Sequence, residues 1–233
     1  MDEGATGAHR APRPFGGARL LVWTLLVTLG GTLGLALPAA AYIASNRIDM
    51  PVWGVYPTVA LAGALQGLFV GVAQAASLHR TVIAVPRAGW SLITMAGALV
   101  AWSLGMLPST LAALGEPINL DSRRVLGLAV AGAAVLLFVV PIAQWLLLRR
   151  VLVGAWLWVL VVAGAILLAL GAVWGVSQVI DTSLPLDEMA PTLALGGGVV
   201  ALVFALVTGF GLWMMAPRPR RDALPARAAG PTT

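Results

Sequence analysis

The chain has 233 residues, of which 60% are hydrophobic and only 10% are charged, well below the roughly 25% of a soluble globular domain. All 14 basic residues are arginine, the formal net charge is +5, and cysteine is absent, which excludes disulfides, thiolate catalysis and cysteine-ligated metals. Because the arginines lie near the ends of apolar stretches and in two short tails, they are typical of membrane topology signals, and we expect no nucleic-acid partner.

Six apolar stretches are each long enough to cross the hydrocarbon core of a bilayer. In chain order the predicted helices cover 19–44, 57–78, 88–107, 125–148, 153–180 and 191–216. Pro57 suits the first turn of its helix, Pro108 is expected to end the third helix, and Pro141 is expected to kink the fourth. We therefore predict an all-α integral membrane protein with six transmembrane helices in 19–216. A flexible cytoplasmic tail at 1–18 and a basic cytoplasmic tail at 217–233 flank it.

The arginines are distributed unequally between the two sides of the predicted bundle. Eleven lie in the two tails and in the connections after the second and fourth helices, whereas three lie in the opposite connections. Since arginine-rich connections stay in the cytoplasm, we expect a bacterial inner-membrane protein with both termini cytoplasmic. The arginines expected to fix this orientation or to contact lipid headgroups are Arg80, Arg149, Arg150, Arg218, Arg220 and Arg221. A cleaved signal peptide is the alternative for the first helix, but the apolar run from Leu20 to Leu37 exceeds the roughly 7–15 residues of a signal core.

Nine tryptophans accompany the predicted helix ends. Those near cytoplasmic ends are Trp23, Trp90, Trp145, Trp156, Trp158 and Trp213, and those toward outer ends are Trp53, Trp102 and Trp174. Aromatic belts of this kind mark both membrane interfaces, so we predict that the tryptophans anchor the helices and do not stack on a ligand.

A repeat of about 70 residues relates the three pairs of predicted helices. The aligned residues near the ends of the second, fourth and sixth helices are Gln74, Gln144 and Leu212. The aligned residues near the starts of the first, third and fifth helices are Trp23, Trp90 and Trp158. We therefore predict three helical hairpins, at about 19–80, 88–150 and 153–216, arranged as parallel repeats about a pseudo-threefold axis along the membrane normal.

The helix end Gln144–Arg150 and its looser counterpart Gln74–Arg80 are each followed by a short connection and a tryptophan-containing helix start. This pattern resembles a group of uncharacterised bacterial multi-pass membrane proteins in which a Gln-Trp-x-x-x-Arg-Arg type segment recurs. The third copy has Leu212 in place of the glutamine. The resemblance covers about half of the chain. It implies a six-helix fold of this type and carries no known activity.

Ionisable side chains are missing from the predicted helix interiors, so a carboxylate relay for proton-coupled transport has no candidate residue. The two histidines lie in the N-terminal tail and at a helix end, which does not suit a haem or a histidine-based metal site. Intramembrane proteolysis would need paired aspartates, a serine–histidine pair or a metal. We therefore expect no catalytic residue, no cofactor, no metal site and no enzymatic activity.

The polar groups that remain are amides, and small residues accompany them. The glutamines that we predict within the membrane are Gln66, Gln74 and Gln144. One hypothesis is that Gln74 and Gln144 line a site for a small solute or lipid headgroup that enters from the cytoplasm. The other is that their amides bond to neighbouring helices, which stabilises the bundle by roughly 0.6–2 kcal/mol each. The glycines expected to allow close helix packing are Gly63, Gly67, Gly71 and Gly209.

Two hypotheses about function follow. The first is a non-enzymatic accessory, scaffold or assembly subunit of a membrane complex, with membrane lipids and other membrane-protein subunits as partners. The second is a transport component for a small neutral or lipophilic solute, either a permease or a substrate-binding subunit. They differ in whether the hairpins enclose a cavity or close on one another.

Overall fold

The computed structural model describes residues 15–79, 81, 83, 85–116, 118–179 and 186–216, with 186–190 described as backbone only. This part of the chain is all-helical. Its helices are α1 (Gly17–Arg47), α2 (Val52–Leu78), α3 (Arg87–Ala113), α4 (Arg123–Leu148), α5 (Leu157–Ser177) and α6 (Leu186–Met215). Each of the six contains a stretch long and apolar enough to cross a membrane, which confirms that part of the prediction.

The third helix does not end at Pro108, so this part of the prediction is wrong. α3 continues through Pro108 to Ala113, and Gly115, at φ +83°, follows its C-cap. The N–H of Gly115 bonds to the carbonyl of Ala112 at 3.1 Å, and the N–H of Glu116 bonds to the carbonyl of Leu111 at 2.9 Å. These two bonds form a Schellman motif, which requires the left-handed conformation that glycine adopts without steric cost. The true stop signal is therefore Gly115.

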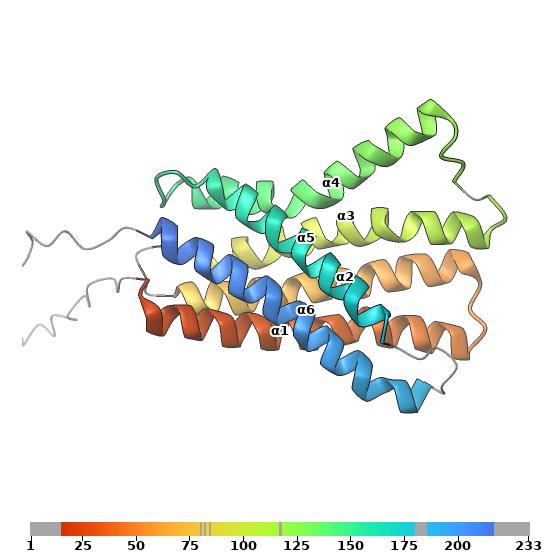
Figure 1. Cartoon of the computed structure of the whole chain (residues 1–233), viewed down its shortest axis with the longest axis horizontal. Coiled ribbons are helices and arrows are strands. Elements are labelled where there is room, and N and C mark those ends of the chain that lie inside the picture. The colour runs from red at the N-terminus through yellow and green to blue at the C-terminus, as the bar shows by residue number, and fades with distance from the viewer. Residues whose placement is uncertain are drawn as a thin grey trace, which may run out of the picture.

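The six helices form a closed ring in chain order. Each packs against its neighbours in the sequence, and α6 packs against α1. Among the described helices, those that are not neighbours in this ring make no close backbone contact. Figure 1 shows the start of α1 and the end of α6 at the same end of the bundle, together with the α2–α3 and α4–α5 connections. We call this the terminal end. No described helix runs through the centre of the ring, so the centre is occupied by side chains and by a cavity.

The buried core lies toward the terminal end. Its largest fully buried side chains include Trp23, Trp90, Trp158, Leu78, Leu148 and Leu212. At the opposite end α4 diverges from the other helices (Figure 1). The buried residues of α4 are Pro141, Gln144 and Leu148, all within its last two to three turns. The bundle is therefore tightly packed at one end and loosely packed around α4 at the other.

Glycines set the close approach of α2 to α3. A Cβ atom at Gly63 would overlap the Trp102 ring, one at Gly67 would overlap the Cβ atom of Ala98, and one at Gly71 would lie 2.8 Å from the Cα atom of Ser91. On α6, a Cβ atom at Gly209 would lie 2.6 Å from Cδ1 of Trp23. All four glycines predicted as packing positions therefore lie against a neighbouring helix, where a side chain would force the helices apart.

Candidate functional site

Three tryptophans from alternate helices meet at the centre of the terminal end. Trp23 of α1, Trp90 of α3 and Trp158 of α5 are each 0% exposed. The Trp158 ring centroid lies 6.2 Å from that of Trp23, edge to face, and 6.2 Å from that of Trp90 in a tilted arrangement. Such separations favour attraction between the rings. The prediction that these three residues are interfacial anchors is wrong, because an anchor needs contact with the interface.

Each of the three indole N–H groups donates to a side chain of an even-numbered helix. The pairs are Trp90 Nε1 to Gln74 Oε1 (3.0 Å), Trp158 Nε1 to Gln144 Oε1 (3.0 Å) and Trp23 Nε1 to Thr208 Oγ1 (3.1 Å). The acceptors come from α2, α4 and α6. An indole N–H has no acceptor function, so in the first two pairs the amide oxygen must face the ring, and the orientation of the amide is set by chemistry.

The two glutamines also bond to each other. Gln144 Nε2 donates to Gln74 Oε1 at 3.0 Å and to Thr94 Oγ1 at 2.9 Å. Gln74 and Gln144 are 0% and 1% exposed. Gln74 Nε2 is buried and has no hydrogen-bond partner. Gln74 and Gln144 thus lie together in a packed polar network between α2, α3, α4 and α5, and neither lines the cavity.

A cavity of about 470 Å³ lies inside the ring, beyond this network as seen from the terminal end. All six helices contribute to its wall, and contributing residues at aligned positions are Gly31, Ala98 and Ile166 of the odd helices and Gln66, Leu136 and Phe204 of the even ones. Among the described lining residues, hydrogen-bonding side chains come from Gln66, Thr94 and Trp102 alone, and none is ionisable. The wall is therefore almost wholly apolar.

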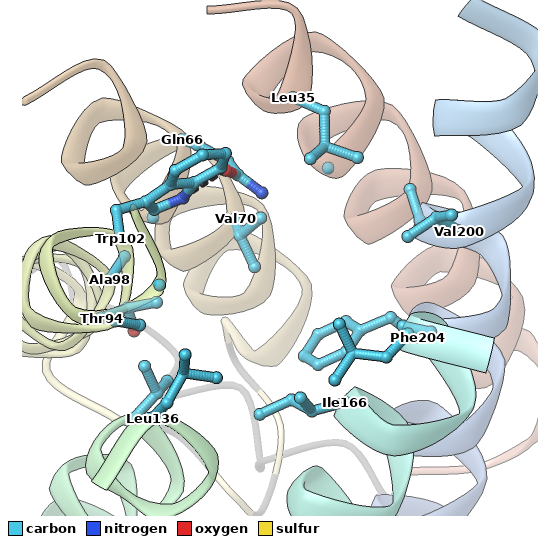
Figure 2. A pocket seen from close by; sticks show the side chains of 18 of the residues that line it. Leu35, Gln66, Val70, Thr94, Ala98, Trp102, Leu136, Ile166, Val200 and Phe204 are labelled. Carbon is cyan, nitrogen blue, oxygen red and sulfur yellow. Dashed lines mark hydrogen bonds between the residues drawn. The ribbon is translucent and has the colours of Figure 1, made fainter. Parts of the chain in front are cut away.

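Gln66 is the predicted glutamine that does line the cavity. Its Oε1 accepts a hydrogen bond from Trp102 Nε1 at 2.8 Å. Figure 2 shows the amide oxygen facing the indole of Trp102 and the amide nitrogen directed into the space between the helices. Thr94, on the same wall, donates to the carbonyl of Trp90 at 2.8 Å and accepts from Gln144. Thr94 thereby connects the cavity wall to the buried network.

Two of the predicted arginines, Arg149 and Arg150, are described, and they lie away from this site. Arg149 and Arg150 follow α4 at the terminal end and are exposed, and the guanidinium carbon of Arg149 lies 5.1 Å from the centre of the Trp145 ring. This distance permits a cation–π contact. The other predicted arginines, Arg80, Arg218, Arg220 and Arg221, lie outside the described residues.

The sequence pattern did not predict that Thr94, Trp102 and Thr208 belong to this site. Thr94 and Thr208 could not be recognised from the sequence, because a single threonine in an apolar helix is common and forms no motif that indicates a role. The position of Trp102 near the outer end of its predicted helix predicts an interfacial residue instead. The signal that could have found it is Gln66 in the preceding helix, because a buried amide needs a partner and an indole supplies a donor.

The described site offers amide, hydroxyl and indole groups around an apolar space, which suits binding by shape and by hydrogen bonds. Within the described residues, histidine, aspartate and glutamate do not gather into a group that could hold a metal ion. Comparisons with known protein families, with curated proteins and with solved structures give no match for this chain, so its function is inferred from the geometry above.

Proposed function

We propose that this chain is an integral membrane protein that crosses a bilayer six times, with its terminal end in the cytoplasm. Large apolar side chains cover the outward faces of the helices, as at Leu29 on α1, Leu128 on α4 and Leu168 on α5, each more than half exposed. Such a surface is unfavourable in water and suits hydrocarbon. Arginines at the terminal end, including Arg19, Arg87 and Arg149, support its cytoplasmic position.

Cysteine labelling tests this orientation, because the natural chain contains no cysteine. Ser122→Cys lies at the opposite end of the bundle, and Val153→Cys lies at the terminal end, where Val153 is 98% exposed. We expect a membrane-impermeant maleimide to label Ser122→Cys on intact spheroplasts and Val153→Cys only after permeabilisation. The reverse pattern would place the termini outside.

We also propose that the helices form three parallel hairpin repeats about a pseudo-threefold axis. In support, the aligned tryptophans are all fully buried and gather at one point, and the aligned positions near the ends of the even helices are all at most 1% exposed. Aligned residues of all three hairpins also line the cavity. These shared environments are expected if the axis runs through the tryptophan cluster and the cavity.

The function that this geometry favours is the binding of a small neutral or lipophilic molecule inside the bundle, by a permease or a substrate-binding subunit. The cavity carries this proposal. Its volume of about 470 Å³ lies within the roughly 300–1,000 Å³ of small-molecule sites. Since its described wall contains no charged group, a charged ligand would lose its hydration without compensation. A neutral, largely apolar molecule pays no such penalty.

Entry from the membrane fits the loose packing of α4. Leu136 and Val140 of α4 and Leu170 of α5 line the cavity, while the N-terminal half of α4 diverges from the bundle (Figure 1). A ligand dissolved in the bilayer would reach the cavity most easily between α4 and α5.

A cavity-filling substitution tests the proposed binding. Ala169 lines the cavity, whereas Leu167, two residues earlier on α5, is 56% exposed on the outer face. The probe is an aliphatic diazirine of about 13 carbons, photolysed with the purified full chain in nanodiscs. We expect labelling of peptides that line the cavity to fall in Ala169→Phe and to persist in Leu167→Phe, with outward-facing peptides as the internal reference. Equal cavity labelling in both variants would contradict the proposal.

The second candidate, an accessory or assembly subunit, is favoured by one observation. The N-terminal half of α4 presents Leu126, Leu128 and Val130 without packing them against the rest of the chain. Native mass spectrometry of the protein released gently from its own membranes separates the candidates. A stoichiometric protein partner supports the subunit, and a lone chain that retains a small molecule supports ligand binding.

A further inference from the structure

Gln66 is held against α3 by a packing arrangement that the sequence alone did not suggest. Gly63, three residues before Gln66 on α2, leaves room for the Trp102 ring to lie on the helix surface. The ring then places its N–H 2.8 Å from Gln66 Oε1. A side chain at position 63 would displace the indole and with it the hydrogen bond.

Trp102 decides which end of the Gln66 amide meets the cavity. Because the indole nitrogen only donates, the amide oxygen must face it, and the NH2 group must point the other way. Figure 2 shows this NH2 group directed into the cavity. Among the described residues, Gln66 Nε2 donates no hydrogen bond. Two N–H donors are therefore presented to an apolar space.

The other polar groups of the wall are already engaged. The hydroxyl hydrogen of Thr94 is donated to the Trp90 carbonyl, and the N–H of Trp102 is donated to Gln66. The NH2 group of Gln66 is thus the donor left for a ligand among the described side chains of the wall. An unpaired polar group in a low-dielectric cavity is costly, so a ligand that supplies an acceptor is favoured over one that does not.

We propose that the cavity binds a neutral lipophilic molecule that carries a carbonyl or ether oxygen, and that the Gln66 NH2 group donates a hydrogen bond to this oxygen. This inference rests on the proposed function, since it assumes that the cavity binds a lipophilic molecule. Trp102 is a positioning residue: it contacts the amide oxygen and turns the two N–H donors toward the ligand. The remaining wall, formed by aliphatic and aromatic side chains, contacts the apolar part.

Two photoreactive probes of equal length test the inference in the full chain in nanodiscs. One is the 13-carbon aliphatic diazirine, and the other is the same chain with a ketone in place of one methylene. We expect the ketone probe to label cavity-lining peptides roughly fivefold more than the hydrocarbon probe at limiting concentration, relative to outward-facing peptides. This preference reports the hydrogen bond separately from apolar binding.

Variants assign the preference to Gln66. Gln66→Met keeps an unbranched side chain of similar length and should abolish the ketone preference. Trp102→Phe keeps an aromatic ring but frees the amide to rotate, and it should weaken the preference. The double variant removes both polar groups without leaving an unpaired indole, so it covers the case in which Gln66→Met does not fold. Gln178→Met, at the exposed end of α5, is the matched control and should leave the preference unchanged.

The outcomes distinguish this inference from the proposed function. If both probes label the cavity equally in the natural chain, or if the preference survives in Gln66→Met and in the double variant, the inference is wrong and lipophilic binding stands. If neither probe labels cavity peptides above the outward-facing ones, or Ala169→Phe leaves the labelling unchanged, the proposed function fails and the inference fails with it.

Discussion

Buried indole N–H groups explain why polar side chains persist in so apolar a bundle. A donor that leaves water must find an acceptor or cost free energy. Trp90 and Trp158 find amide oxygens, whereas Trp23 faces the hairpin in which Leu212 occupies the aligned position. A leucine cannot accept a hydrogen bond, and Thr208, one turn earlier on α6, supplies the acceptor.

Gln144 is the residue whose loss should cost most, because its amide makes three hydrogen bonds. We expect Gln144→Leu to lower the free energy of unfolding by about 2 kcal/mol, since Trp158 Nε1 loses its acceptor while Gln74 and Thr94 lose a donor. Thermal unfolding in detergent, followed by tryptophan fluorescence, measures the change. Gln178→Leu, at an exposed position, is the control and should have little effect. Equal effects of the two variants would mean that the network does not stabilise the bundle.

At the scale of elements, the packing of helices differs sharply around the ring. Small residues on α2 bring it against α3, and α1 also approaches closely, since a Cβ atom at Gly30 would lie 2.8 Å from the Cβ atom of Ala73. On α4, by contrast, a Cβ atom at Gly127 or Gly132 would meet no other atom within 4 Å. Helix association in lipid depends on such close contact, so α4 is the element held least firmly.

Matched glycine substitutions test this difference. We expect Gly67→Ala to lower the free energy of unfolding by about 1–3 kcal/mol, because the new methyl group overlaps Ala98 and approaches the carbonyl of Thr94. Gly132→Ala, in the interior of α4, meets open space and should be neutral or slightly stabilising, because alanine favours the helix. Chemical denaturation in mixed micelles compares the two variants. A larger loss in Gly132→Ala than in Gly67→Ala would contradict the packing described for α2 and α3.

At the scale of the whole molecule, the ring of six helices surrounds two different central layers. The layer toward the terminal end is filled by tryptophans and glutamines, and the layer beyond it is a cavity with an apolar wall. The filled layer separates the cavity from the terminal end. If the terminal end is cytoplasmic, the ligand reaches the cavity from the bilayer or from the outer side.

The proposed threefold repeat predicts the consequence of restoring its missing glutamine. Gln144 Nε2 donates to Gln74 Oε1, whereas Gln74 Nε2 is buried without a partner. If each of the three aligned positions donated to the next one around the axis, the acceptor for Gln74 Nε2 would be the side chain at position 212. We therefore expect Leu212→Gln to raise the free energy of unfolding by about 1 kcal/mol, measured by thermal unfolding, while Leu212→Met, similar in size, does not. A loss of stability in Leu212→Gln larger than that in Leu212→Met would count against the repeat.

Composition and the lengths of the apolar stretches were sufficient to predict six helices that could span a membrane, because apolar length is a local property that every such helix must satisfy. Local sequence did less well at helix ends. Pro108 predicts a helix end by its sequence alone, but an apolar helix accommodates a proline, and the chain reverses only where Gly115 permits a positive φ.

Glutamine and tryptophan positions could be aligned from the sequence, but their partners could not. The sequence left open whether Gln74 and Gln144 line a cavity or join helices, because both roles use the same residue types at the same spacing. Tertiary structure places these two in a buried network and Gln66 on the cavity wall. The physical reason is the closed ring, which brings α2, α3, α4 and α5 together around one point. The sequence of a single helix does not determine which residues of the other helices it will meet there. Apolar length alone therefore determined six helices that could span a membrane. The ring decided which amide is buried and which one faces the cavity.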